Sequence, residues 1–282
     1  MKMLVNLLCC FVPNKKWRKK VRYYLLGNKK QLARLEKCGK FEITEIDGVK
    51  VAQCNGLNLG CIFDGDGVII VEEIFKNEEY NFDIGTESVV IDIGMNIGLA
   101  SLYFAARDDV KEVYGFEPFK PTFEQAVFNF RINEKYAKKI HPYNYGLGNE
   151  DKELILEYYS GAPGRMSTVK SVEEIRPSRK NETKKEVVQI KNAAKDISSI
   201  VERHKDKKII IKCDTEGSEK EIFESLDSKG ILKNIDMIML EYHFSYDVPL
   251  LDILRRNGFA FFKQKTVSLE TGNFGMIRAI KK

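Results

Sequence analysis

From residue 88 onward, short apolar runs alternate with longer amphipathic stretches. Runs of β-branched and aliphatic residues predict buried strands, and the stretches between them predict helices. The predicted strands cover residues 88–93, 112–116, 140–145, 208–214, 237–242, 259–265 and 274–280, and the predicted helices cover 97–106, 121–133, 193–203, 219–226 and 250–257. Because these strands are too apolar for an exposed face, the pattern predicts an α/β fold whose mostly parallel sheet carries helices on both faces.

Two segments depart from this alternation. Residues 41–87 are predicted to form a small β-rich lead-in of short strands and turns, with a hairpin turn at Asp47-Gly48 and a turn before the apolar run 68–71. An extra strand is predicted at 154–159, and the polar residues 160–190 that follow predict a mobile insertion. The proposed organisation is therefore a segment 1–40, the lead-in 41–87 and a main domain 88–282 that contains the insertion.

Charge is distributed unevenly along the chain. The whole sequence has a net charge of +5, but residues 1–40 alone hold twelve Lys and Arg and a single acidic residue. The remainder is therefore net acidic, which argues against a nucleic-acid-binding surface on the main domain. Six cysteines without CxxC spacing and three scattered histidines predict no metal site and fit a reducing cytoplasm.

The N-terminal segment could meet a membrane surface. Its apolar run 4–12 is far shorter than the roughly 20 residues needed to span a bilayer, and it has neither the basic leader nor the cleavage site of a secretory signal. Trp17, Val21, Tyr24 and Leu25 fall at helical spacing between Lys and Arg. This pattern is typical of a helix that lies on an anionic membrane, here through residues 1–30. A basic helix packed on the body of the protein remains the alternative.

The strongest chemical signal is the segment 90–98, in which a buried strand ends at Asp92 and a turn with Gly94, Asn96 and Gly98 leads into a helix. The glycines are expected to let the backbone approach a ligand closely. A dinucleotide would require GxGxxG, but Asn96 replaces the second glycine, and the carboxylate of Asp92 would repel a phosphate. A cationic ligand without phosphate, such as S-adenosylmethionine, fits better than a nicotinamide dinucleotide.

Further polar groups follow the other strands. Glu117 ends the next strand, where a carboxylate can accept both hydrogen bonds of a ribose diol. Asp214 and Glu216 lie at the end of the predicted strand 208–214 and are candidates for acceptor binding or proton abstraction. His243 follows the predicted strand 237–242 and is a candidate general base.

Other roles stay open for these groups. His243 could instead be structural or orient the substrate, and Glu219 could cap the following helix. Lys212 could pair with one of the neighbouring acids.

Together, the segments 92–98, 116–118, 214–219 and 241–243 resemble the FkbM family of S-adenosylmethionine-dependent methyltransferases. The resemblance implies a Rossmann-like class I methyltransferase fold with a seven-stranded sheet, S-adenosyl-L-methionine as cofactor, and O-methylation. It assigns cofactor binding to Asp92 and Glu117 and to the glycine turn. Met95 stands where a small residue is usual in the turn, and Cys213 stands where an aliphatic residue is usual.

The basic segment 11–20 is also similar, over a short stretch, to segments that open enzymes of bacterial surface-polysaccharide assembly. This similarity favours a small-molecule or lipid-linked glycan acceptor and a cytoplasmic protein on the inner face of the membrane. Two alternatives stay open: a metal-dependent methyltransferase with Asp214 and Glu216 as magnesium ligands, and a non-catalytic, membrane-associated module that binds the cofactor.

Overall fold

The computed structural model describes residues 34–35, 41–63, 67–159, 167, 183–269 and 272–282. The predictions for residues 1–33 and for residues 160–166 and 168–182 of the insertion therefore lie outside the described residues. The chain divides into two compact units, Met1–Glu79 and Tyr80–Lys282. None of the described helices is long and apolar enough to cross a membrane.

In the first unit, β1 (Phe41–Ile46), β2 (Val49–Cys54) and β3 (Leu57–Gly60) form an antiparallel sheet. The predicted turn at Asp47-Gly48 is confirmed, and both of its residues have positive φ angles. The apolar run 68–71, predicted among short strands and turns, is instead part of helix α3 (Gly67–Val71), which continues into a π-helical turn, η2 (Glu72–Lys76). A four-residue apolar run has no periodicity of its own, so hydrophobicity alone could not separate strand from helix.

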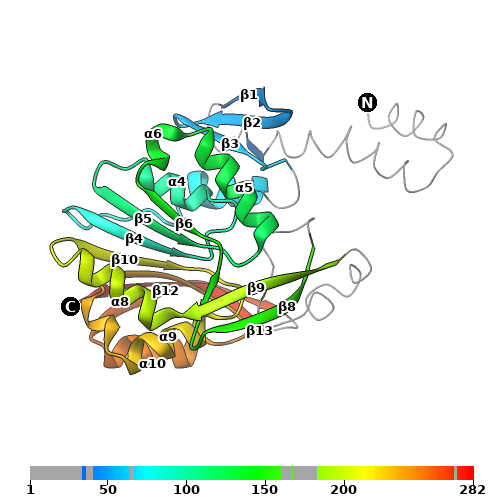
Figure 1. Ribbon diagram of the computed structural model, residues 1–282. Coiled ribbons are helices and arrows are strands. Elements are labelled where there is room, and N and C mark those ends of the chain that lie inside the picture. The colour runs from blue at the N-terminus through cyan, green and yellow to red at the C-terminus, as the bar shows by residue number, and fades with distance from the viewer. Residues whose placement is uncertain (1–33, 36–40, 64–66, 160–166, 168–182, 270–271) are drawn as a thin grey trace. The chain divides into compact units, whose positions relative to one another are not determined.

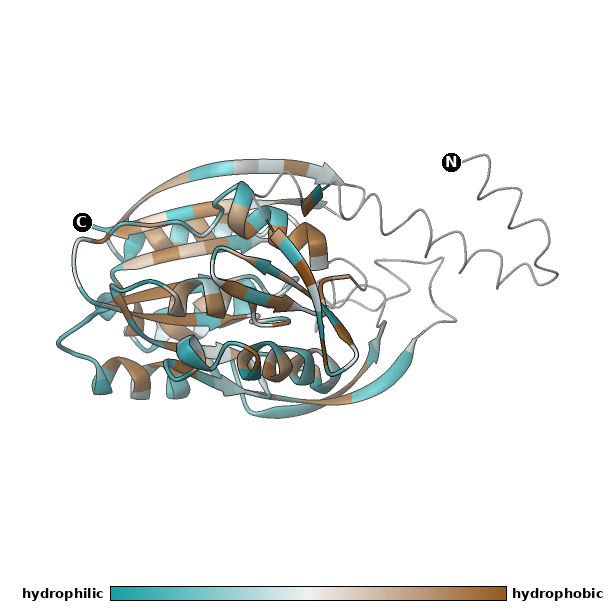
Figure 2. Ribbon diagram, turned by 90° about the horizontal axis from the view of Figure 1, so that it is seen from above, coloured by the Kyte–Doolittle hydropathy of each residue, from teal (hydrophilic) through white to brown (hydrophobic). Residues whose placement is uncertain are grey.

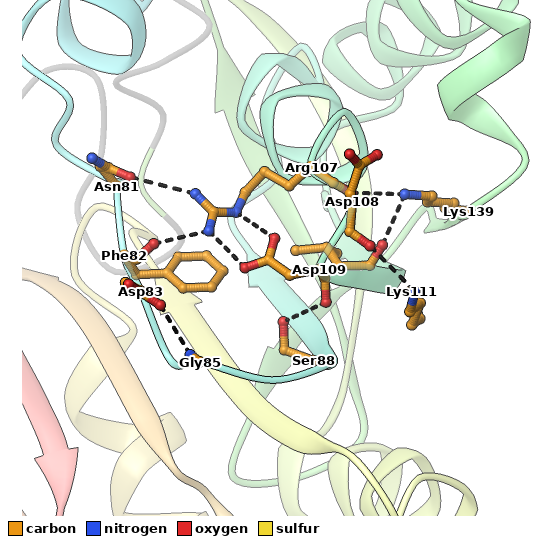
Figure 3. A network of polar contacts seen from close by, with 11 residues as sticks. Asn81, Phe82, Asp83, Gly85, Ser88, Arg107, Asp108, Asp109, Lys111 and Lys139 are labelled. Atoms are coloured by element: carbon orange, nitrogen blue, oxygen red, sulfur yellow. Dashed lines mark hydrogen bonds and ion pairs between the residues drawn. The ribbon is translucent and has the colours of Figure 1, made fainter.

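The second unit begins at Tyr80, earlier than the predicted boundary at residue 88. Figure 3 shows the contacts of the residues between Tyr80 and β4. The Arg107 guanidinium donates to the Phe82 carbonyl at 2.9 Å, lies 4.2 Å from the centroid of the Phe82 ring and forms an ion pair with Asp109. Ser88 in turn donates to the carbonyl of Asp109. These contacts attach Phe82 to the loop 107–109 before β5, and that loop in turn to the start of β4.

The main sheet has seven strands in the order β12-β13-β11-β10-β4-β5-β6. Their bounds are β4 (Ser88–Ile93), β5 (Val110–Phe116), β6 (Ile140–Tyr143), β10 (Lys208–Cys213), β11 (Met237–Tyr242), β12 (Phe259–Leu269) and β13 (Gly272–Lys281). The five strands from β6 to β11 are parallel, and β13 and β12 add an antiparallel edge. The predicted seven-stranded, mostly parallel sheet is confirmed.

Helices cover both faces of this sheet (Figure 1). One group comprises α4 (Leu99–Ala105), α5 (Lys120–Arg131) and α6 (Glu134–Ala137), and the other comprises α8 (Ala193–Arg203), α9 (Glu219–Ser228) and α10 (Asp247–Arg256), with a short 3-10 helix η5 (Ile231–Asn234) after α9. All six residues of β4 are buried, as a strand covered on both faces requires. Figure 2 shows the central strands as largely hydrophobic.

A second, three-stranded sheet has the order β7-β9-β8. Its strands are β7 (Gly146–Gly148), β8 (Lys152–Tyr158) and β9 (Lys184–Asn192). The sequence did not predict β7, and β9 occupies the end of the segment 160–190 that was predicted as a mobile insertion. Val188 and Ile190 are buried on β9, so alternate apolar positions stabilise a strand among its Lys and Glu residues.

The strands β4, β5, β10 and β11 are parallel and adjacent, so their carboxyl ends lie at one edge of the sheet. The order of the chain reverses between β4 and β10, because β5 lies on one side of β4 and β10 on the other. Ligands of open parallel sheets bind at such a switch point. The polar residues that the sequence placed after these four strands therefore meet there.

Candidate cofactor and acceptor site

A pocket lies at the switch point. Its polar wall comes from the turn after β4 (Gly94, Asn96), from Glu117 after β5, and from Asp214, Thr215, Glu216 and Ser218 after β10. Its apolar wall comes from Phe116, Phe119, Leu147 and Ile190. Leu147 and Ile190 belong to the second sheet, so this sheet completes the pocket.

The glycine turn is constrained by the protein itself. Gly94 has φ +79°, and a Cβ atom there would lie 1.8 Å from the carbonyl oxygen of Asp214. Gly98 has φ +80°, and its Cβ atom would lie 2.7 Å from the Phe130 ring. The expected close approach therefore occurs, but to the loop after β10 and to α5, and each position requires glycine whether or not a ligand is bound.

The amide groups of the turn are all used internally. Gly94 and Met95 donate to the Phe116 carbonyl, and Gly98 donates to the Met95 carbonyl. The Asn96 amide donates to Glu117 Oε2 at 3.0 Å, and the Asn96 side chain accepts from the Ile97 amide. A phosphate-binding loop needs free amide groups, so this turn is not built for a pyrophosphate.

Glu117 lies at the pocket wall with only 6% of its surface exposed. Oε2 accepts the Asn96 amide and Oε1 accepts the Phe119 amide at 2.9 Å. Each oxygen keeps acceptor capacity for one more donor, which matches the two hydroxyls of a ribose. Burial raises the pKa of Glu117 to about 7, against the opposing effect of the two amides and of Lys212.

Asp92 is fully buried and does not line the pocket. Its Oδ2 accepts from Ser101 Oγ at 2.6 Å, and its Oδ1 forms an ion pair with Lys212 Nζ at 3.1 Å. The expected pairing of Lys212 with an acid is thus found, and its partner is Asp92. The prediction that the Asp92 carboxylate itself attracts a cationic ligand is not supported by this geometry, because the carboxylate already has its cation beneath the turn.

The loop after β10 brings the predicted acceptor-side acids to the pocket. Asp214 and Glu216 both line it, and the hydroxyl of Tyr80 donates to Asp214 Oδ2 at 3.4 Å. Ser167, from the predicted insertion, donates to the Glu216 carbonyl at 2.5 Å. The insertion therefore touches the acceptor-side loop at one described residue.

His243 is 8% exposed and lies behind this loop, outside the pocket lining. Its Nδ1 is 2.9 Å from Glu219 Oε1, and its Nε2 is 3.5 Å from Glu216 Oε2. Burial favours the neutral ring, but the two glutamates and Asp214 outweigh it and raise the pKa of His243 well above its usual value. An imidazolium cannot accept a proton, so the geometry disfavours the role of general base.

Glu219 anchors the loop. Its fully buried Oε1 accepts from the Thr215 amide, the Thr215 hydroxyl and the Gly217 amide at 3.0–3.1 Å, besides the His243 contact. Burial opposes ionisation, but the His243 and amide hydrogen bonds prevail and lower the pKa of Glu219. The sequence suggested a helix cap; the structure places the carboxylate on the amides of the preceding loop.

Of the predicted site residues, Gly94, Asn96, Glu117, Asp214 and Glu216 meet at the pocket. Asp92, Gly98 and His243 support it from behind. The sequence pattern did not identify Tyr80, Phe119, Leu147 or Ile190. The run Gly-Leu-Gly of β7 carries no periodic signal, so nothing local could have identified Leu147.

These residues fit S-adenosylmethionine. Its adenosine has a ribose diol for Glu117, an adenine for the apolar wall, and no phosphate to require free amides. The described residues include no group of three His, Cys, Asp or Glu side chains arranged to hold a metal ion.

The strand order and the polar groups at the carboxyl edge define a Rossmann-like fold of the class I methyltransferase type. The sequence model of the methyltransferase FkbM domain matches residues 92–261, more than half of the chain. The chain belongs to this family of S-adenosylmethionine-dependent methyltransferases, and S-adenosyl-L-methionine is the cofactor of the family.

The similarity to individual proteins is low and covers only part of the chain. The chain is 32% identical over 120 residues to the AMB antimetabolite synthetase AmbE of Pseudomonas aeruginosa, a match that covers 42% of this chain but only 5% of that protein. It is 27% identical over 171 residues to methyltransferase 1 of Beauveria bassiana, which covers 57% of this chain and 67% of that protein.

Two solved structures are also similar. The methyltransferase FkbM of Methylobacillus flagellatus matches with a TM-score of 0.43 and 16% identity, over 69% of this chain and 43% of that chain. A Streptococcus pneumoniae protein in complex with S-adenosyl-L-methionine matches with a TM-score of 0.41 and 12% identity, over 70% of this chain and 67% of that chain.

Proposed function

We propose that this protein transfers the methyl group of S-adenosylmethionine to a hydroxyl oxygen of a small, sugar-derived acceptor. The observation that carries the proposal is the joint position of Glu117 and Asp214 on one pocket, at the ends of strands on either side of β4. The first carboxylate suits a ribose and the second suits a hydroxyl that must lose its proton.

Cofactor binding falls to the polar and apolar walls together. Glu117 would hold the ribose, Gly94 and Asn96 would bound the methionine part, and Phe119 and Ile190 would enclose the adenine. The bound cofactor supplies an electrophilic methyl group, and the remaining catalytic work is alignment of the acceptor oxygen and removal of its proton.

On the acceptor side, Asp214 would receive the proton of the hydroxyl, and Glu216 would hold a neighbouring hydroxyl. His243 takes no part in proton transfer and keeps Glu216 and Glu219 in place. The insertion would bound the acceptor through Ser167, which already meets the loop.

The acceptor is proposed to be a glycan or lipid-linked glycan of bacterial surface-polysaccharide synthesis, methylated in the cytoplasm. The basic segment 1–30 would then bring the enzyme to the anionic inner face of the membrane. These points rest on the sequence pattern of the N-terminal segment.

The test is a methyl-transfer assay with methyl-labelled S-adenosylmethionine and a panel of sugars, sugar nucleotides and lipid-linked sugars. Label should enter an acceptor oxygen, and Asp214→Asn should lower the rate of transfer by about 10²–10⁴-fold while S-adenosylmethionine still binds. Label on nitrogen or carbon would refute O-methylation. Loss of activity with a chelator, restored by magnesium, would favour metal-dependent transfer, and cofactor binding without transfer to any acceptor would favour a binding module.

A further inference from the structure

A buried lysine that the proposed chemistry does not use lies beneath the glycine turn. Lys212 is only 3% exposed, and Asp92 is its direct cross-strand partner in the sheet. Its Nζ forms the ion pair with Asp92 at 3.1 Å and donates to the Gly94 carbonyl at 2.6 Å. Burying two charges costs desolvation energy that their attraction barely repays, so the pair is weak as a source of stability alone.

The contacts of Lys212 complete a set that fixes the turn from two sides. On the β5 side, the amides of Gly94 and Met95 bind the Phe116 carbonyl. On the β10 side, Lys212 binds the Gly94 carbonyl. The peptide groups of Gly94 are thus held at both ends, and the next residues bring the Asn96 amide to Glu117.

Lys212 also carries a charge at this place. Burial acts to lower the pKa of Lys212, but the attraction of Asp92 and Asp214 prevails and raises it, so the group is an ammonium ion at neutral pH. The same charge lowers the pKa of Glu117, whereas the charge of Asp92 raises it. The pKa of Glu117, the proposed ribose-binding carboxylate, therefore depends on both charges of the ion pair between Lys212 and Asp92.

We propose that Lys212 is a positioning residue for the cofactor: its ammonium group ties the Gly94 carbonyl to the buried carboxylate of Asp92 and so fixes the turn that carries Asn96 to Glu117. Asp92 acts on the cofactor through Lys212 rather than by contact. The inference rests on the proposed binding of S-adenosylmethionine at Glu117.

The first experiment measures amide hydrogen exchange of residues 93–99 in the cofactor-free protein. Lys212→Met should accelerate it by about tenfold or more, because a hydrogen bond from a charged donor is lost. The double variant Asp92→Asn/Lys212→Met leaves no unpaired buried charge and should show the same acceleration. The matched control is Lys208→Met, which removes an ion pair with Asp236 at the other end of β10 and should leave this segment unchanged. Unchanged exchange in the double variant would overturn the proposal.

The second experiment titrates these proteins with S-adenosylmethionine at several pH values. Lys212→Met should weaken binding. It should also move the acid limb of the affinity profile, the pH range in which affinity falls on acidification, to higher pH, because the pKa of Glu117 rises when the ammonium charge is removed. The double variant should also bind weakly but keep its acid limb near that of the wild type, since both charges are gone. Wild-type affinity and acid limb in Lys212→Met would refute the positioning role. Absence of binding by the wild type would refute the proposed function instead, and hydrogen exchange would still decide the role of Lys212.

Discussion

Replacement of His243 by alanine distinguishes two roles of this residue: a general base in the reaction, and a cation that only stabilises the fold. The variant leaves the fully buried carboxylate of Glu219 without its imidazolium partner at 2.9 Å. Removal of one member of a buried pair costs about 3–5 kcal/mol. Three donors from Thr215 and Gly217 still reach Glu219 Oε1, so we expect a loss at the lower end, about 3 kcal/mol. For a domain of this size, this loss lowers Tm by about 6–12 °C.

The pH dependence of this loss has a definite sign. The folded protein holds the pKa of His243 above its usual 6.5, so the stabilisation is fully present below that pH and disappears as pH rises through the raised pKa. The difference in unfolding free energy between wild type and variant should therefore be largest near about pH 6 and shrink in alkali. Urea unfolding across this range measures it.

The control is His141→Ala, because His141 also pairs with a glutamate at 2.9 Å but its side chain is 42% exposed. Such a pair contributes about 0–1 kcal/mol. Turnover completes the test and is measured well below the Tm of the variant. Loss of a general base lowers kcat by about 10²–10⁴-fold, whereas we expect His243→Ala to lower kcat by less than about tenfold. The reasoning would be refuted if His243→Ala lowered kcat by about 10²–10⁴-fold while its free energy of unfolding stayed at the wild-type value.

Three further predictions concern the pocket. Gly94→Ala should destabilise the protein by about 2–5 kcal/mol in urea unfolding, because its Cβ would collide with the Asp214 carbonyl, whereas Gly48→Ala, with the same sign of φ and open space around it, should cost about 1 kcal/mol. The affinity for S-adenosylmethionine should fall as pH decreases below about 7, since protonation of Glu117 removes an acceptor for the ribose; calorimetry at constant ionic strength measures it, and a flat profile would contradict the assignment. Asp214→Asn should lower kcat by about 10²–10⁴-fold and leave cofactor affinity within about twofold, and retained turnover would remove Asp214 as base.

The sequence predicted the main sheet well because its strands are buried on both faces. β4, β11 and α8 have the predicted bounds, and the two closing strands were also found. Short or locally ambiguous segments were missed: α3 is an apolar run without periodicity, and β7 has three residues. Their conformations depend on partners that are distant in the chain.

The site was predicted in part for a similar reason. Residues at strand ends converge by topology, so the sequence alone could place Glu117, Asp214 and Glu216 together at one pocket. The pattern could not show that Asp92 is paired below the turn or that His243 lies between two glutamates. Such roles depend on burial and charge partners, which spacing does not encode.

The central claim is most directly tested by calorimetric titration of the protein with S-adenosylmethionine beside Glu117→Gln. Well above the pKa of about 7 of Glu117, where its carboxylate is ionised, the wild type should bind with micromolar affinity. The variant should bind about 10–100-fold more weakly, because the amide that replaces the charged carboxylate has one neutral acceptor oxygen and an NH2 group that cannot accept a hydrogen bond. Folded wild-type protein that binds no S-adenosylmethionine, or a variant that binds as tightly as the wild type, would contradict the account.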